Sequence, residues 1–395
     1  MRPTRLALPG AAAALLIVPL VGVGPSVADG RDGDDDHDDE VTLEDRTVLV
    51  KNLDNPRGLT VDRGGNVFVA QAGEGRGTDA SAPCFPGPEG DDVCLGATGK
   101  ISELHMHGRS GRLRVVTDEV TGLPSVAAKA DGSGGIGPSD VDFHRNRLFA
   151  TIGLGADPAV RDQVPATYRD LASKLATVHK FDLKRDTATE VADIGEYEAT
   201  ANPEKDDFDT NPNSLVSDRR GHVVADAGGN SLLHVDRDGD VSTIFVFPKE
   251  AAVDSPMGRI SPDAVPTTVV KGPDDAYYVS QLTGFPFVKG TATVWRFERG
   301  EAPEVFADGF TNVIDLAFTD DDDLLVLEIS TNGLLSGDPK GALHWVDGDD
   351  TDDRKVLTTE LTLPGGVAVD GDHVYVTNMS AMANVGEVLR FTLDD

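Results

Sequence analysis

The stretch Asn55-Pro-Arg-Gly-Leu-Thr-Val-Asp-Arg-Gly-Gly-Asn-Val-Phe-Val-Ala-Gln71 is the first copy of a pattern that returns five more times before the C-terminus. It begins with polar, Pro and Gly residues, continues as a short apolar run, turns through a Gly-rich segment, and ends in a second apolar run closed by a polar residue. Two such runs around a tight turn are typical of two strands joined in a hairpin. The other copies occupy residues 137–151, 211–226, 265–281, 312–328 and 363–378.

A second phrase follows each copy: an apolar residue, two variable residues, another apolar residue, then a turn and one more run of strand-forming residues. Its instances are residues 101–104, 178–181, 232–235, 294–297, 343–346 and 388–391. Each repeat therefore predicts four strands, except the last, which ends at Phe391-Thr-Leu-Asp-Asp395 without a fourth. The segment Arg46–Leu53 has strand character and no repeat of its own, so it is predicted to supply the missing strand. The predicted fold is all-β, a six-bladed β-propeller whose N-terminal strand closes the last blade.

The N-terminus reads as an export signal. Residues 1–28 carry Arg2 and Arg5, then an apolar run over residues 6–23, then small residues at both ends of Ser26-Val-Ala28. The alternative is a membrane anchor, but Pro and Gly interrupt the run and a cleavage site follows it. We therefore expect a secreted protein, cut after Ala28, with no membrane span in its mature form.

An acidic leader, residues 29–45, is expected to be solvated and disordered before the propeller domain of residues 46–395. It contains Asp34-Asp-Asp-His-Asp-Asp-Glu40, for which metal scavenging is an alternative interpretation. The 395-residue chain carries a net charge of −33. Such a charge keeps a protein soluble and disfavours nucleic acid as a partner. A monomer is expected.

The two cysteines, Cys84 and Cys94, lie in a Gly/Pro/Asp-rich excursion over residues 73–98. In an exported protein an isolated pair enclosing a short loop predicts a disulfide. A redox pair or half of a zinc site would need a C-x-x-C motif or further cysteines, and the sequence has neither.

Two segments carry a family resemblance: residues 211–236, from Asn211-Pro-Asn-Ser to His234-Val-Asp236, and residues 265–297, with Leu282-Thr-Gly-Phe-Pro-Phe287. They resemble the ScyD/ScyE family of secreted proteins, and the likeness extends over residues 48–393. The blade phrases are also shared with NHL and gluconolactonase-like propellers. The resemblance implies a six-bladed extracytoplasmic propeller, a family associated in cyanobacteria with production of the pigment scytonemin. The chain departs from the family pattern at Gly272-Pro-Asp-Asp-Ala276 and in its leader.

Catalytic motifs are absent: the sequence has no G-x-S-x-G, no H-E-x-x-H, no P-loop and no Cys/His cluster. Polar residues recur instead at two positions of the repeat, where first strands begin and where second strands end. Both positions are predicted to lie near the propeller axis, with capping of backbone groups as the alternative role. Besides Arg57 and Thr268 at strand starts and Gln71 and Thr151 at strand ends, the candidate axial residues are Asp140, Asn213, Asp226, Gln281, Asp315, Glu328 and Asn378.

Two function classes follow. The first is a binding or scaffold propeller for a small molecule, a glycan or a protein. The second is a metal-dependent hydrolase or lactonase of the gluconolactonase-like kind. Converging carboxylates with amide neighbours suit calcium better than zinc, and Asp226 and Glu328 are the predicted ligands.

Overall fold

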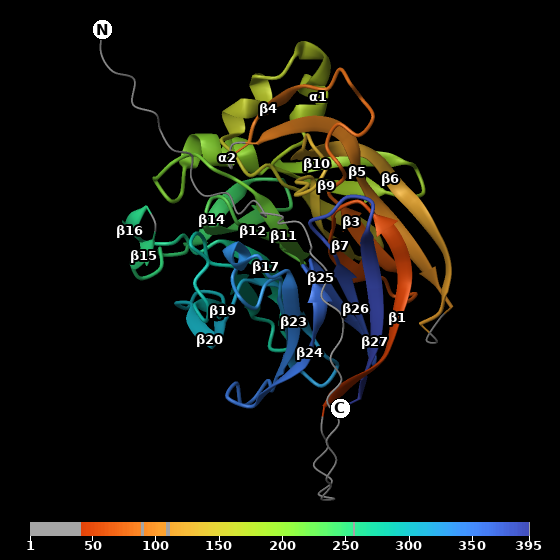
Figure 1. Ribbon diagram of the computed structural model, residues 1–395, viewed down its shortest axis with the longest axis vertical. Helices are drawn as coiled ribbons and strands as arrows, with labels where there is room; N and C mark the ends of the chain where they lie inside the picture. Colours follow the sequence, from red (N-terminus) through yellow and green to blue (C-terminus); the bar gives the residue numbers. More distant parts are fainter. Residues whose placement is uncertain (1–40, 88–90, 108–110, 256, 395) are drawn as a thin grey trace, which may run out of the picture.

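The computed structural model describes residues 41–87, 91–107, 111–255 and 257–394 (Figure 1). The predicted export signal and residues 29–40 of the leader lie outside the described residues. The rest forms six sheets of four or more strands, and a separate two-stranded hairpin.

One strand from each sheet surrounds the propeller axis, and each contacts the inner strands of both neighbouring sheets. The ring closes because the first and last of these strands touch. In chain order, which also numbers blades 1 to 6, these inner strands are β2 (Pro56–Val61), β7 (Pro138–His144), β11 (Pro212–Ser217), β17 (Pro266–Lys271), β21 (Val313–Phe318) and β25 (Gly366–Asp370).

The other strands of each blade follow outward, each antiparallel to the one before it. The second strands are β3 (Val67–Gln71), β8 (Arg147–Ile152), β12 (Gly221–Asp226), β18 (Tyr277–Gln281), β22 (Leu324–Glu328) and β26 (His373–Asn378). The third strands are β5 (Asp92–Met106), β9 (Thr177–Asp182), β13 (Ser231–Asp236), β19 (Ala292–Phe297), β23 (Lys340–Val346) and β27 (Gly386–Asp394). The outer strands are β6 (Leu113–Ala128), β10 (Thr187–Asp193), β14 (Val241–Val246), β20 (Glu304–Phe310), β24 (Arg354–Thr362) and β1 (Thr42–Leu53).

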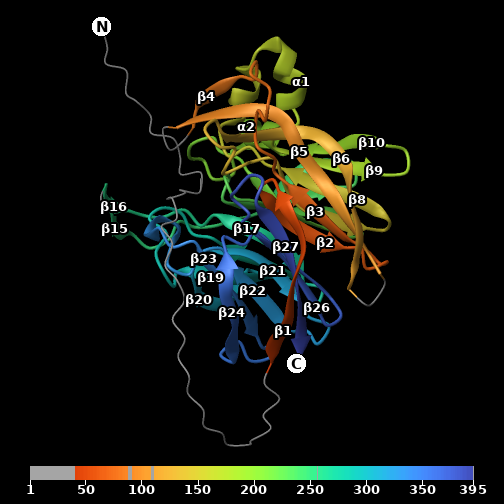
Figure 2. The same cartoon turned by 45° about the vertical axis from the view of Figure 1, so that its right-hand side comes forward.

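The predicted closure is confirmed. β1 pairs antiparallel with β27, with Thr47 opposite Arg390 and Val48 opposite Leu389, and the two strands run side by side in both ribbon views (Figures 1 and 2). β1 begins at Thr42, earlier than the predicted Arg46, so the end of the predicted leader belongs to the last blade. Because the first and last segments of the chain share one sheet, blade 6 has no unpaired third strand.

The apolar core lies between the blades. The second strands are almost completely buried, as in β12 and β22, because a neighbouring blade covers each of their faces. Aromatic contacts join adjacent blades: Phe68 stacks on Phe143, with ring centroids 5.1 Å apart, and Phe247 meets Trp295 at 6.2 Å. The outer strands β14 and β20 carry many exposed residues instead, because no further strand covers them.

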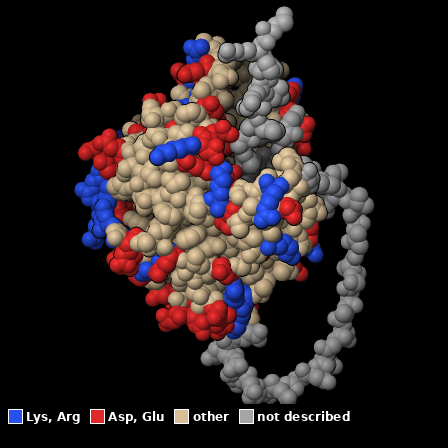
Figure 3. Space-filling model, turned by 90° about the vertical axis from the view of Figure 1, so that its left-hand side faces the viewer, with Lys and Arg blue, Asp and Glu red and all other residues tan. Residues whose placement is uncertain are grey.

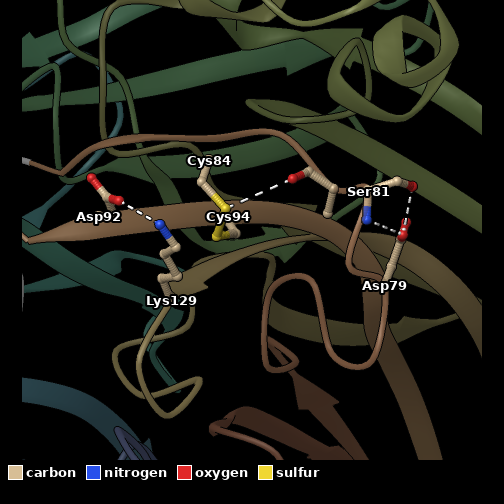
Figure 4. The surroundings of a disulfide bond; sticks show 7 residues. Asp79, Ser81, Cys84, Asp92, Cys94 and Lys129 are labelled. Carbon is tan, nitrogen blue, oxygen red and sulfur yellow. Dashed lines mark hydrogen bonds and ion pairs between the residues drawn. A yellow bond between two sulfur atoms is a disulfide. The ribbon is translucent and has the colours of Figure 1, made fainter.

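Blade 1 carries an added strand. β4 (Cys84–Pro86) pairs with β5, placing Cys84 opposite Cys94, and the predicted disulfide is confirmed between them (Figure 4). Lys129 pairs with Asp92 at 2.7 Å beside this bond. The excursion over residues 73–98 is therefore fixed to blade 1 by pairing as well as by a covalent bond.

The helical spacing of Tyr168, Leu171 and Leu175 predicts one helix over residues 158–175, and this prediction is wrong. The segment forms two 3₁₀ turns, Pro158–Asp162 and Ala166–Tyr168, and one α-helical turn, α1 (Arg169–Ala172). Pro165 separates the turns because proline lacks the N–H that a continuous helix needs. A second helix, α2 (Ile194–Ala201), follows β10.

The remaining elements are small. A 3₁₀ turn spans Leu334–Ser336, and the hairpin β15 (Val253–Ser255) and β16 (Gly258–Ile260) projects from the body between blades 3 and 4 (Figure 1). Among the described residues no helix has the length and apolar character to cross a membrane. On the face shown in Figure 3, acidic side chains form patches around an uncharged middle.

Candidate functional site

The second residues of five inner strands line a cavity of about 70 Å³ at one end of the propeller axis. The loops that follow the second strands and the segments that precede the inner strands form the rest of its wall, including Asp209 before β11. The five inner-strand residues are Arg57, Ser139, Asn213, Thr267 and Ile314. This end of the axis is the mouth, and the five residues are the mouth ring.

The third residues of the inner strands form a second layer, joined by hydrogen bonds across blades. Ser214 donates to Asp140 Oδ2 at 2.7 Å, and the hydroxyls of Ser214 and Thr268 are 3.1 Å apart. Thr268 in turn hydrogen-bonds to Asp315, which also accepts the N–H of Val367 from blade 6 at 2.8 Å. A polar chain therefore links Asp140 in blade 2 to Asp315 in blade 5.

The two axial carboxyl groups are perturbed together. Burial, reinforced by the charge of Asp315, raises the pKa of Asp140 well above its usual value. Burial also raises the pKa of Asp315 to about 6, against the opposing hydrogen bonds from Val367, Thr268 and Leu316. The pair thus keeps a proton in weakly acidic solution, because two desolvated like charges disfavour full ionisation.

Glycines of blades 1 and 6 adjoin this layer: Gly58, the third residue of β2, and Gly366, the first residue of β25. A Cβ atom on Gly58 would lie 2.2 Å from Asp140 Oδ1, and one on Gly366 would lie 3.0 Å from the Cα of Gly58. The absence of a side chain at Gly58 lets the Asp140 carboxylate approach the backbone of β2, and its absence at Gly366 lets blade 6 approach Gly58.

Arg57 is the one basic residue of the mouth ring. Its Nη2 donates to the carbonyl of Gly135 at 2.6 Å, and no carboxylate of the described residues pairs with it. Burial lowers its pKa to about 10, so the guanidinium is still charged at neutral pH. Its side chain lines the cavity, where its remaining N–H donors meet no acceptor among the described residues.

The ends of the second strands have a different role. Each of four side chains accepts the backbone N–H of a residue shortly before the inner strand of its own blade: Gln71 from Asp54 at 2.9 Å, Asp226 from Asn211 at 2.6 Å, Glu328 from Thr311 at 2.6 Å, and Asn378 from Thr362 at 2.7 Å. Gln281 is buried with neither amide atom bonded to a described residue, and Thr151 makes only a 3.4 Å contact with the carbonyl of Asn213. Gln71, Asp226, Glu328 and Asn378 therefore satisfy backbone groups, as the capping alternative proposed, and Gln281 does not.

The predicted convergence of all seven candidate residues on the axis is therefore not what the structure shows. Asp140 and Asp315 lie together in the second layer, and Asn213 lies above them in the mouth ring. Asp226, Gln281, Glu328 and Asn378 do not line the cavity. Their strands end beside the loop that leads into the inner strand, and the unpaired N–H groups of that loop attract them.

Sequence reasoning named Arg57 and Thr268 only as polar strand starts, and it missed Ser139, Thr267 and Asp209. The available signal was the common offset: each mouth-ring residue directly follows the first residue of an inner strand, which is proline in four blades. Asp209 precedes the repeat, so no pattern marked it.

The axial carboxylates do not fit a bound divalent cation, because donors already occupy their oxygen atoms. Asp140 accepts the N–H groups of Val141 and Leu215 besides the Ser214 hydroxyl. Asp315 accepts those of Leu316 and Val367. Calcium takes six to eight oxygen ligands, and these two groups have few lone pairs left. Asp226 and Glu328, the predicted ligands, are committed to backbone donors in the same way.

A group of metal-ligand type does exist on blade 1, away from the inner strands. Glu103 and His105 of β5 and Glu119 of β6 have ligand atoms that all lie within 4.8 Å of one another. His105 Nδ1 is 3.1 Å from Glu103 Oε1, and Thr117 bonds both His105 Nε2 and Glu119. The sequence signal was the spacing of two residues, which places Glu103 and His105 on one face of a strand.

Comparison with known proteins shows likeness in fold. No family model and no curated protein matches the chain. A structural-genomics protein of unknown function from Bacteroides thetaiotaomicron aligns with a TM-score of 0.53 at 9% identity, covering 90% of this chain and 76% of the other. A gluconolactonase from Xanthomonas campestris gives 0.49 at 11% identity, covering 88% and 89%, and virginiamycin B lyase from Staphylococcus aureus gives 0.46 at 12% identity, covering 89% and 99%. At these identities the likeness concerns the fold alone, and the ScyD/ScyE resemblance remains a resemblance.

Proposed function

We propose that this protein is an exported six-bladed propeller that binds a small polar molecule at the mouth of its axis. The observation that carries the proposal is the mouth ring, where hydroxyl, amide and guanidinium groups of Ser139, Asn213 and Arg57 line one small cavity. A cavity with a few convergent polar groups is the usual form of a small-molecule site. The ScyD/ScyE resemblance supports the same class, a secreted propeller without an assigned reaction.

The cavity offers little for nucleophilic chemistry. The hydroxyl of Ser139 donates to the carbonyl of Gly137, and that of Thr267 bonds the carbonyl of Val313. Among the described residues that line the cavity there is no histidine to activate either hydroxyl. This favours binding over acyl transfer.

Ile314 provides the test of binding, since it lines the cavity and its side chain makes no hydrogen bond. A panel of small carboxylates, amides, amines and sugars is screened by thermal shift, and hits are titrated by calorimetry. Ile314→Phe should abolish binding by filling the mouth, whereas Ile244→Phe, on the exposed outer strand β14, should leave it unchanged. A hit that binds both variants equally, or a panel without hits, contradicts the proposal.

A gluconolactonase-like hydrolase is the second candidate, and one observation favours it. Burial and the neighbouring carboxylates, Asp226 first among them, raise the pKa of Asp209 to about 7, the range of a general acid or base. The assay is hydrolysis of a set of lactones and esters by wild type and Asp209→Asn. Turnover that the substitution removes would replace binding with catalysis as the function.

Export is part of the proposal and has its own measurement. The basic start, the apolar run and the small residues before Asp29 support cleavage there, and the Cys84–Cys94 bond suits an oxidising compartment. N-terminal sequencing of protein from the culture medium should begin at Asp29. Full-length protein retained inside the cell would contradict export.

A further inference from the structure

Arg57 differs from two other arginines with little exposed side chain, because those two form ion pairs with carboxylates. Arg161, with 13% of its side chain exposed, pairs with Asp193 at 2.9 Å, and Arg296, with 21% exposed, pairs with three carboxylates. Arg57 has one carbonyl partner and no carboxylate among the described residues. Arg57 is half-buried, and a partly desolvated charge without a counter-ion is costly, so proteins usually pair such groups.

The nearest axial carboxyl group does not act as that counter-ion. Asp140 lies against Gly58, the residue next to Arg57, but no ion pair forms between the two side chains. Burial and the charge of Asp315 raise the pKa of Asp140, and the opposing effects come from hydrogen bonds of Ser214, Leu215 and Val141, with no contribution from Arg57. Ser214 and the backbone of Leu215 hold the Asp140 carboxylate.

Arg57 lines the cavity and still has open hydrogen-bond donors. A guanidinium has five N–H donors in a planar fork, and the Gly135 carbonyl takes one of them. A planar carboxylate matches such a fork with two parallel hydrogen bonds. The anion that Arg57 lacks can therefore come from a molecule in the cavity.

The surroundings limit the charge of that molecule. One guanidinium neutralises one negative charge, and the other ionisable group lining the cavity is Asp209, a carboxyl group. Asp140 and Asp315 lie in the layer beneath, and the whole chain carries −33. A second negative charge on the ligand would meet only repulsion, so a dianion such as phosphate is disfavoured.

We infer that Arg57 is the specificity residue of the mouth cavity and that the ligand presents a single carboxylate to it. This inference rests on the proposed binding function and names the chemical class of the ligand. Asn213, Ser139 and Thr267 supply the remaining polar contacts of the cavity.

The experiment compares matched probes of similar size: propionate, its neutral amide propionamide, and inorganic phosphate, each titrated into the mature protein by ligand-observed NMR and calorimetry. Propionate should bind at least tenfold more tightly than propionamide and phosphate. Arg57→Gln should weaken propionate binding at least tenfold, Arg57→Lys should weaken it less, and Arg63→Gln, at the exposed turn after β2, should leave it unchanged.

A second readout separates recognition from a structural role. Removal of a half-buried charge that pairs with no carboxylate of the described residues should leave the melting temperature of the ligand-free Arg57→Gln protein equal to wild type or higher, whereas a structural role predicts a fall. The carboxylate inference fails if propionamide binds as well as propionate, or if Arg57→Gln binds propionate like wild type.

The two proposals fail differently. If neutral probes bind wild type and Ile314→Phe abolishes their binding, the binding function stands and the carboxylate inference is overturned. If no probe of the panel binds, both are overturned. If Arg57→Gln does not fold, the selectivity of the wild type for propionate over propionamide still tests the carboxylate inference.

Discussion

Polar side chains at the starts of the inner strands and at the ends of the second strands occupy the same face of the propeller, yet they do different work. Asp140, Ser214, Thr268 and Asp315 bond one another across blades. Asp226, Glu328, Gln71 and Asn378 bond backbone within their own blades. The difference shows that a polar residue at a strand end forms hydrogen bonds with the unsatisfied groups that lie nearest to it. Second-strand ends reach loop N–H groups, and inner-strand starts reach the axis.

The largest effect is expected from removal of a cap. Asp226→Ala leaves the N–H groups of Asn211 and Gly229 and the hydroxyl of Thr210 without their acceptor. The loss should be roughly 3 kcal/mol of unfolding free energy, since each buried unpaired group costs about 1–3 kcal/mol. The matched variant in the same blade is Asn213→Ala, which loses one bond to the carbonyl of Thr267 and should cost about 1 kcal/mol. If denaturant unfolding gave equal losses of free energy for Asp226→Ala and Asn213→Ala, the proposed difference between the capping position and the mouth ring would be contradicted.

The axial pair should make stability depend on pH. The folded pKa of Asp315 is raised to about 6, above its unfolded value near 3.8, so the folded state binds more protons between these values. The contribution of this group to the free energy of unfolding is therefore highest below about pH 4. It falls by roughly 3 kcal/mol as the pH rises through 6. Asp315→Asn should flatten this part of the profile.

Thr268→Val is the companion variant for the pH measurement. It keeps the carboxyl group of Asp315 but removes the hydroxyl whose hydrogen bond lowers the pKa of Asp315. The loss of stability with rising pH should therefore extend to higher pH than in wild type. Chemical denaturation at intervals from pH 4 to 8 measures both variants, and profiles identical to wild type would show that the chain from Asp140 to Asp315 is not formed.

Two glutamines test the capping role from within one set. Gln71 is bonded at both amide atoms, to the N–H of Asp54 and to Ser102, whereas Gln281 is buried without a described partner at either. Gln71→Leu should lower the free energy of unfolding by about 2 kcal/mol, because it leaves the N–H of Asp54 and the hydroxyl of Ser102 without their partner. Gln281→Leu should be neutral or stabilising, because it removes a buried unpaired amide. Thermal unfolding of the two variants checks this, and a larger loss at Gln281 would contradict it.

The smallest expected effect is that of calcium. With residues 1–40 deleted, wild type and an Asp226→Asn, Glu328→Gln double variant should give the same calorimetric titration with calcium, because backbone donors occupy both carboxylates. A binding event in the wild type that the double variant lacks would restore the ligand prediction made from the sequence. His105→Gln controls for uptake at Glu103, His105 and Glu119.

The repeat made most of the fold predictable. Local alternation of apolar and polar residues predicts the strands, and the six copies of the repeat predict six blades of four strands. The segment Arg46–Leu53 has no repeat of its own, so counting the strands also predicts how the ring closes. The disulfide was predictable for the same reason, since Cys84 and Cys94 have no other partners. The prediction of one helix over residues 158–175 was wrong because apolar spacing alone does not account for Pro165, which interrupts the helix.

The site was predictable only in outline. The sequence by itself determined that polar groups would collect at one end of the axis, since it places them at fixed points of every repeat. Tertiary structure decided which of them turn toward the axis and that Asp140 and Asp315 share a hydrogen-bonded chain. It also decided that Arg57 forms no ion pair with a carboxylate of the described residues. The physical reason is that these side chains meet partners from other blades, about 50 or more residues away along the chain, and no local pattern records which group arrives at hydrogen-bonding distance.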